Sequence, residues 1–269
     1  MSFDPSEWLN IVLRWTHVFA AIMWVGQTYF FTWLDGRFTE LERAANGGAK
    51  ENGLWMVHSG GFYVVQKQSF PRLMAQKLHW FKWEAMMTWI SGIGLLTLVY
   101  YAGGMLSDAR YDQATSIAIG LGFIVVGWLV YDLLWSTLFS SNEQLGVVVS
   151  FLLSVLMIYS LSQFFGGRTA YIHAGAVFGS IMTANVWIRI IPAQKKMVAA
   201  LLEGKKPDLT LGAKAKTRSK HNTFLVVPVV FMMISNHYPT VSYGSDYGWV
   251  LLSALVLVGW GAAKFLRKA

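Results

Sequence analysis

Long apolar runs dominate this chain, and the polar segments that separate them are spaced as in a membrane-spanning helical bundle. A helix needs roughly 20 apolar residues to cross the hydrocarbon core, and about seven runs approach that length. They cover residues 8–33, 79–106, 114–138, 145–165, 170–191, 223–238 and 249–265. The pattern predicts an all-α fold, a polytopic membrane helical bundle that forms a single domain over residues 1–269. The sixth run is short and contains Pro228 and Asn236, so its helix is expected to kink or to begin earlier, near Ser219.

Basic residues gather in alternate polar segments, and this asymmetry predicts the orientation of the bundle. Lysine and arginine are concentrated in residues 34–78, in residues 192–222 and after the last run, whereas the segments on the other side hold only Arg110 and Arg168. Cytoplasmic loops carry the excess of positive charge. We therefore expect the N-terminus outside, the C-terminus inside, and residues 34–78 and 192–222 as cytoplasmic loops.

These two loops have different predicted structures. Residues 54–66 read as two β-prone runs, LWMVH and FYVVQ, around Ser59-Gly60-Gly61, which predicts a hairpin with a glycine-supplied turn. Residues 192–222 are polar and lysine-rich, with Gly204, Pro207 and Gly212, which predicts a short helix followed by a flexible connector.

The amino-acid composition excludes several kinds of cofactor site and partner. The chain is 55% hydrophobic and 13% charged, with a mean hydropathy of +0.43. Cysteine is absent, which excludes disulfides, iron–sulfur clusters, thiolate zinc sites and covalent attachment of haem c. The net charge of +8 is explained by the basic loops, so it does not indicate a nucleic-acid partner.

The predicted orientation divides the six histidines into two groups. Ionisable residues at membrane depth are costly and mark proton relays, cofactor ligands or substrate paths. Neutral imidazole is also a common haem ligand. The outer group, which we interpret as candidate ligands of a haem b, contains His17, His173 and His237. The alternative for this group is hydrogen bonding between helices or proton relay.

The inner group is His58, His79 and His221, and it lies among other polar residues. In the run 78–84, helical spacing would place His79 and Lys82 on one face, while Glu84 would lie about one turn inside the membrane. The segment 218–222 supplies a second polar cluster, and Asn185 and Gln194 add amides. Cations, amides and aromatics together favour a site for a small, planar, polar anion. The alternative is a basic membrane rim with snorkelling side chains.

Several long motifs resemble the membrane domain of the cytochrome-linked bacterial urate hydroxylases. They are Arg14-Trp15-Thr16-His17, Trp24-Val25-Gly26, His58-Ser59-Gly60-Gly61-Phe62-Tyr63, Leu78-His79-Trp80-Phe81-Lys82-Trp83-Glu84, the segments 179–186 and 191–194, Arg218-Ser219-Lys220-His221-Asn222 and the segment 233–239. The resemblance runs from about residue 14 to residue 240. It implies a multi-pass enzyme of the bacterial cytoplasmic membrane that oxidises urate to 5-hydroxyisourate and passes electrons to a cytochrome c, not to oxygen.

Family members continue into a further span and a c-type cytochrome domain, which this sequence does not contain. Either a separate cytochrome c serves the chain, or the sequence is a truncated or split version. Two other functions share the same helical design with membrane histidines. One is a b-type electron-transfer subunit without substrate chemistry, and the other is a proton-coupled transporter of a purine or metal.

The predicted site follows from the two histidine groups. We expect urate on the cytoplasmic side and haem on the outer side. The expected catalytic residues are His79, Glu84 and His221, the substrate-binding residues are His58, Arg72, Lys82, Asn185 and Asn222, and the haem-iron ligands are His17, His173 and His237.

Overall fold

The computed structural model describes residues 4–44, 53–68, 78–106, 108–139 and 142–267. Within these ranges the chain is almost entirely helical, which confirms the predicted all-α class. The helices are α1 (Pro5–Ala44), α2 (Trp83–Leu95) with the π-helix η1 (Leu96–Tyr101), α3 (Gln113–Ser136), α4 (Glu143–Phe164), α5 (Gly167–Ala184) with the π-helix η2 (Asn185–Ile190), α6 (Ile191–Leu202), α7 (Leu209–Ile234), the short η3 (Ser235–His237) and η4 (Pro239–Val241), and α8 (Gly248–Leu266).

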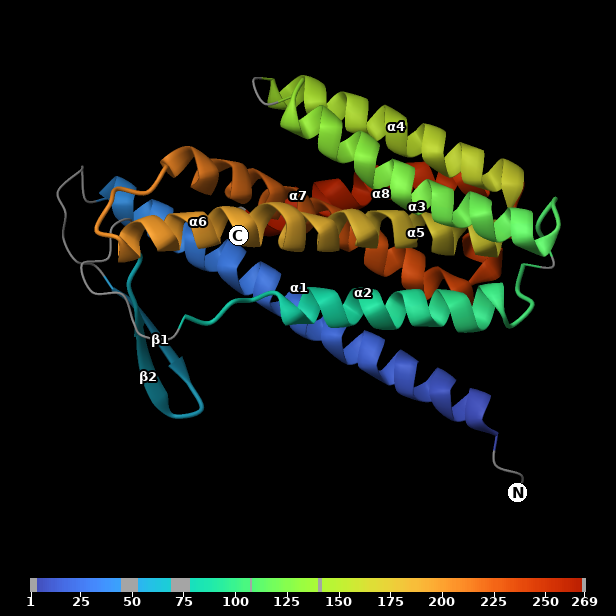
Figure 1. Ribbon diagram of the computed structural model, residues 1–269, viewed down its shortest axis with the longest axis horizontal. Helices are drawn as coiled ribbons and strands as arrows, with labels where there is room; N and C mark the ends of the chain where they lie inside the picture. Colours follow the sequence, from blue (N-terminus) through green and yellow to red (C-terminus); the bar gives the residue numbers. More distant parts are fainter. Residues whose placement is uncertain (1–3, 45–52, 69–77, 107, 140–141, 268–269) are drawn as a thin grey trace.

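Successive helices run back and forth along the long axis of the bundle (Figure 1). The rod formed by α5, η2 and α6 lies at the centre, where α5 packs against α2, α3, α4 and α7. Its side chains are the most enclosed in the molecule, and Ala174 and Val177 have no exposed surface. Close packing needs small residues here: a Cβ at Gly175 would lie 2.6 Å from Met233 Cε of α7.

Within the described ranges, five helical stretches are long and apolar enough to cross a membrane. They are Pro5–Ala44, Gln113–Ser136, Glu143–Phe164, Gly167–Leu202 and Gly248–Leu266. Large apolar side chains such as Leu133 and Val258 point away from the bundle and are 63% exposed each, the pattern of a surface that faces lipid. The predicted number of spans and their orientation remain predictions.

Three predicted boundaries are wrong. Helix α1 continues to Ala44, beyond the predicted end at residue 33. Helix α7 begins at Leu209, well before the predicted start, so only residues 203–208 separate it from α6. Asp208 caps it by accepting a hydrogen bond from Thr210 N at 2.8 Å. Hydrogen bonds from the side chain and then the backbone of Thr210 lower the pKa of this carboxyl. Hydropathy missed this part of the helix because its residues are polar, although most are good helix formers. The third error is at α2, which begins at Trp83, so His79 precedes the helix and shares no helical face with Lys82.

The predicted hairpin is confirmed. β1 (Leu54–His58) pairs antiparallel with β2 (Gly61–Val65), with Met56 opposite Tyr63. Ser59 and Gly60 make the turn with φ of 50° and 77°, the positive values that a tight two-residue hairpin turn requires. The hairpin lies at the end of the bundle where α6 ends and α7 begins (Figure 1).

Candidate functional site

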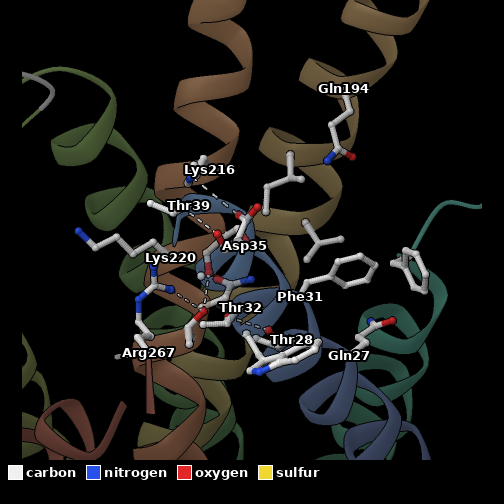
Figure 2. Close-up of a pocket in the computed structure, with 18 of the residues that line it drawn as sticks. Gln27, Thr28, Phe31, Thr32, Asp35, Thr39, Gln194, Lys216, Lys220 and Arg267 are labelled. Carbon is white, nitrogen blue, oxygen red and sulfur yellow. Dashed lines mark hydrogen bonds and ion pairs between the residues drawn. The ribbon is translucent and has the colours of Figure 1, made fainter. Parts of the chain in front are cut away.

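A large cavity opens near that same end of the bundle, and we call it the basic cavity. Its volume is about 1210 Å³, and its walls come from α1, α6, α7, the end of α8 and the segment before α2. Lys216, Lys220 and Arg267 form a cationic wall. Figure 2 shows Lys220 and Arg267 on one side of Asp35, and Phe31 and Gln27 on the other.

The cationic side chains differ in how far their charge is already neutralised. Lys216 Nζ lies 3.8 Å from Asp35, whose other oxygen is 2.9 Å from Lys67 Nζ. Lys220 forms an ion pair with Glu143. Arg267 has a long hydrogen bond of 3.5 Å to Thr223 Oγ1 and lies 5.9 Å from the centre of the Phe224 ring, and no ion pair to a carboxylate is found for it among the described residues. Of these three cations, Arg267 is therefore the one with the most charge available to a ligand.

Aromatic rings form the facing wall. Phe31 and Phe81 lie edge to face with ring centroids 4.9 Å apart, and the imidazole of His79 lies 4.5 Å from Phe81. Amide side chains of Gln27, Gln194 and Asn222 also line the cavity. An aromatic wall opposite cations, with amides between them, suits a flat anion with polar edges.

Behind the basic cavity, polar residues of α3, η2 and α7 form a network that we call the polar core. Asp132, Asn185, Arg218 and Asn222 are buried, Tyr131 and His221 are half-buried, and Arg189 is exposed. Asn222 Nδ2 donates to Met182 O at 2.9 Å. Asn185 Nδ2 donates to Asn222 Oδ1 and to Tyr131 Oη, both at 2.9 Å. Tyr131 Oη in turn lies 2.7 Å from His221 Nδ1.

An ion triad completes the polar core. Asp132 Oδ1 accepts hydrogen bonds from Arg189 Nε at 2.8 Å and from Arg218 Nη2 at 3.0 Å, and Arg189 also pairs with Asp132 Oδ2. Arg218 Nη2 donates to Ser136 Oγ at 2.8 Å as well, and its guanidinium lies 4.9 Å from the centre of the Tyr131 ring. Two guanidinium groups and one carboxylate leave the triad with one net positive charge.

The structure brings together some of the predicted substrate residues. His79 and Asn222 line the basic cavity, and Asn185 and His221 belong to the polar core. Lys82 lies elsewhere, with its ammonium 4.7 Å from the Trp187 ring.

Two more predicted residues do not line the cavity, and a third cannot be placed relative to it. Glu84 lines a separate shallow hollow against α1, beside Trp15. His58 is exposed at the hairpin, where Ser59 Oγ is its partner at 3.0 Å. Arg72 lies outside the described residues.

The histidines of the outer group are arranged differently. His17 Nδ1 lies 2.9 Å from Thr88 O, and His173 Nδ1 lies 2.8 Å from Thr169 O. Because a carbonyl only accepts, both rings carry their proton on Nδ1 and hold a lone pair on Nε2. This is the tautomer of a haem or metal ligand.

The three do not form one cluster. His173 Nε2 is 3.1 Å from Tyr101 Oη, and its ring stacks on Phe165 at 4.7 Å. His237 is exposed in η3. In the described part of the chain, no three His, Asp or Glu side chains are grouped to hold a metal ion.

Sequence reasoning missed several residues of this region. Arg267 and Lys216 were read only as cytoplasmic charges, and Tyr131 was not considered. Asp132 carried a usable signal, because a carboxylate inside an apolar run needs a partner.

Taken together, the architecture is that of an all-α protein with helices of membrane-spanning length and a basic cavity backed by a buried polar network. The chain belongs to the urate oxidase N-terminal family, whose model matches residues 5–269, and this confirms the resemblance. No curated protein and no solved structure matches the chain.

Proposed function

We propose that this protein is a membrane-bound enzyme that hydroxylates urate to 5-hydroxyisourate and passes the electrons to a cytochrome c in the bacterial cytoplasmic membrane. The family supports a reaction of urate. The observation that carries the proposal is the basic cavity, in which a cationic wall faces an aromatic wall.

Urate is a planar monoanion at neutral pH, with carbonyl and N–H groups around its edge. Arg267 is placed to bind its negative charge through a charge-assisted hydrogen bond. Phe31 and Phe81 offer faces and edges for stacking, and the amides of Gln27 and Asn222 match the polar edge. The occupant would be held in a partly desolvated space, where each of these contacts gains strength.

Proton transfer needs a base within reach of the bound ring. His79 lines the cavity and is exposed, so it is the first candidate for the general base that activates urate or the attacking water. His221 lies in the polar core with its Nδ1 2.7 Å from Tyr131 Oη and does not line the basic cavity, so it is a weaker candidate than His79. Glu84 is the weakest of the predicted catalytic residues because it lines a different hollow.

A b-type haem fits the chemistry of the outer histidines. His17 and His173 would hold it through Nε2, since Nδ1 of each ring is bonded to a backbone carbonyl. When bound, the haem would supply one-electron transfer toward the cytochrome c. Tyr101 would have to release His173 Nε2 for this residue to act as a ligand.

The proposal is tested by steady-state urate oxidation with Arg267→Met and with Lys206→Met as the matched control. Both variants remove one positive charge, but Lys206 is an exposed residue of the connector and does not line the cavity. A charged hydrogen bond contributes about 1.5–3 kcal/mol, so Arg267→Met should raise KM by about 10- to 100-fold. The control should leave KM unchanged.

Two results would contradict the proposal. Equal KM values of the two variants would show that urate does not bind in the basic cavity. Absence of urate-dependent reduction of cytochrome c by the haem-loaded, folded protein would refute cytochrome c as its electron acceptor.

A further inference from the structure

A second cavity, which we call the apolar cavity, lies between the α3–α4 hairpin and the helices α5, α7 and α8. Its volume is about 810 Å³. Aliphatic and aromatic side chains form most of its wall, among them Val130, Met157, Val177 and Phe224. The helices that enclose it include four stretches of membrane-spanning length, so its occupant would enter from the bilayer.

Two buried N–H donors that line this cavity have no hydrogen-bond partner, and the first belongs to His221. Its tautomer follows from the polar core. Met182 O can only accept, so the atom of Asn222 that faces it is the amide nitrogen Nδ2. The oxygen Oδ1 of Asn222 therefore faces Asn185, and the atom of Asn185 that faces it is the nitrogen Nδ2. Asn185 donates to Tyr131 Oη, so the tyrosine gives its own proton to His221 Nδ1. The neutral imidazole therefore carries its proton on Nε2, the unpartnered atom.

The second donor is the indole Nε1 of Trp260 on α8, which is also buried without a partner. A buried donor without an acceptor costs about 1–3 kcal/mol. Two such donors in one apolar cavity indicate a neutral, largely apolar ligand with two acceptor oxygens. Lys220 and Arg267 suit a phosphate less well, because Lys220 is paired with Glu143 and Arg267 also lines the basic cavity; Lys264 is the lining cation that an anionic lipid would use instead.

The electrostatic surroundings favour a ligand that gains electrons. The ion triad adds one net positive charge next to Tyr131, the direct partner of His221. Lys264 lies at the mouth of the cavity with Arg267. Positive charge near a reducible group stabilises its reduced form.

We propose that the apolar cavity binds an isoprenoid quinone, with its two carbonyl oxygens accepting hydrogen bonds from His221 Nε2 and Trp260 Nε1. Resting on the proposed function, the quinone is an electron acceptor for urate oxidation. Water adds a hydroxyl group to C5 of urate, and the ring loses two electrons as two protons are released. The quinone takes up both electrons and both protons and becomes the quinol, so atoms and charges balance.

Trp260→Phe tests this assignment because it removes one N–H and keeps an aromatic ring. Trp128→Phe is the matched control: its indole Nε1 is also buried and unpartnered, but Trp128 does not line the cavity. Binding of decylubiquinone to the full-length protein in detergent is measured by calorimetry without urate. Loss of one hydrogen bond should weaken binding about fivefold to tenfold in Trp260→Phe and leave Trp128→Phe unchanged.

A steric pair gives a second, independent measurement. Ser154 lines the cavity, whereas Leu152 on the same helix is 60% exposed on the outer face. Ser154→Phe should abolish quinone binding, and Leu152→Phe should not. Absence of saturable binding in the wild type, or equal affinities within either pair, would overturn the site. Co-purified anionic phospholipid that blocks decylubiquinone would also overturn it, with the lipid as the occupant.

The redox role is measured separately by urate-dependent reduction of decylubiquinone and of cytochrome c. Reduction of the quinone, lost in Ser154→Phe while cytochrome c reduction persists, would support its role as acceptor. Reduction of cytochrome c alone would overturn that role and leave the proposed function standing. If neither acceptor is reduced, the proposed function fails, and the binding result still decides the site.

Discussion

Replacing Asp132 with Asn should destabilise the protein more than any other single loss of a carboxylate. The change removes the negative charge between two guanidinium groups and turns an amide N–H toward the donor of Arg189. The Arg189 side chain is 43% exposed and can reorient, but the Arg218 side chain is only 7% exposed. Removing one partner of a buried pair costs about 3–5 kcal/mol. Because Arg218 keeps its bonds to Asp132 O and Ser136 Oγ, we expect about 3 kcal/mol.

The free energy of unfolding in mixed detergent micelles measures this effect. Glu143→Gln is the control, since it makes the same chemical change in an exposed pair with Lys220 and should cost about 0–1 kcal/mol. Adding Arg218→Met to Asp132→Asn should recover part of the loss, because no unpaired buried charge remains. If Asp132→Asn costs less than about 1 kcal/mol, or if the double variant is no more stable than the single one, the triad does not hold α3 and α7 together as argued.

Four further variants test other parts of the molecule. His17→Ala and His173→Ala should each weaken or abolish a b-type spectrum that His79→Ala retains; unchanged reduced-minus-oxidised spectra in both would refute haem ligation by this pair. Lys82→Met should lower the melting temperature slightly, through loss of a cation–π contact of about 0.5–1 kcal/mol, and leave the KM for urate unchanged. A raised KM would show that Lys82 takes part in urate binding. Gly120→Ala places a Cβ 2.6 Å from His173 Nε2, so thermal unfolding should show a loss of about 1–3 kcal/mol, and wild-type stability would contradict this packing.

The sequence pattern predicts the helices well where hydropathy and helix coincide. Apolar runs gave α3, α4 and α8 within a few residues of their observed bounds. The pattern failed at the first half of α7, where helix formers such as Lys214 and Ala215 are polar or neutral in hydropathy. It also failed at His79, because an apolar aromatic run can precede a helix without joining it.

The site was harder to predict than the fold because it depends on which faces of distant helices meet. The basic cavity contains cations, amides and aromatic rings, the combination that the sequence predicts for an anion site, and this use remains a prediction. The cations that line it include Lys216, Lys220 and Arg267, on α7 and after α8, whereas Lys82 lies elsewhere. The residues next to Arg267 in the sequence do not indicate that it lines a cavity, because the packing of α8 against α7 places it in the cavity wall.

Helix α7 is the common wall of the two cavities. Asn222 lines the basic cavity and His221 lines the apolar one, because consecutive helical residues point about 100° apart. Lys220 and Arg267 border both cavities, so the charge of an occupant on one side is felt on the other. A helix with its side chains is about 10–12 Å thick, which sets the separation between an anion in the basic cavity and a quinone in the apolar one. Substitutions along this face of α7 should therefore alter binding on both sides, whereas those on α4 should alter the apolar cavity alone.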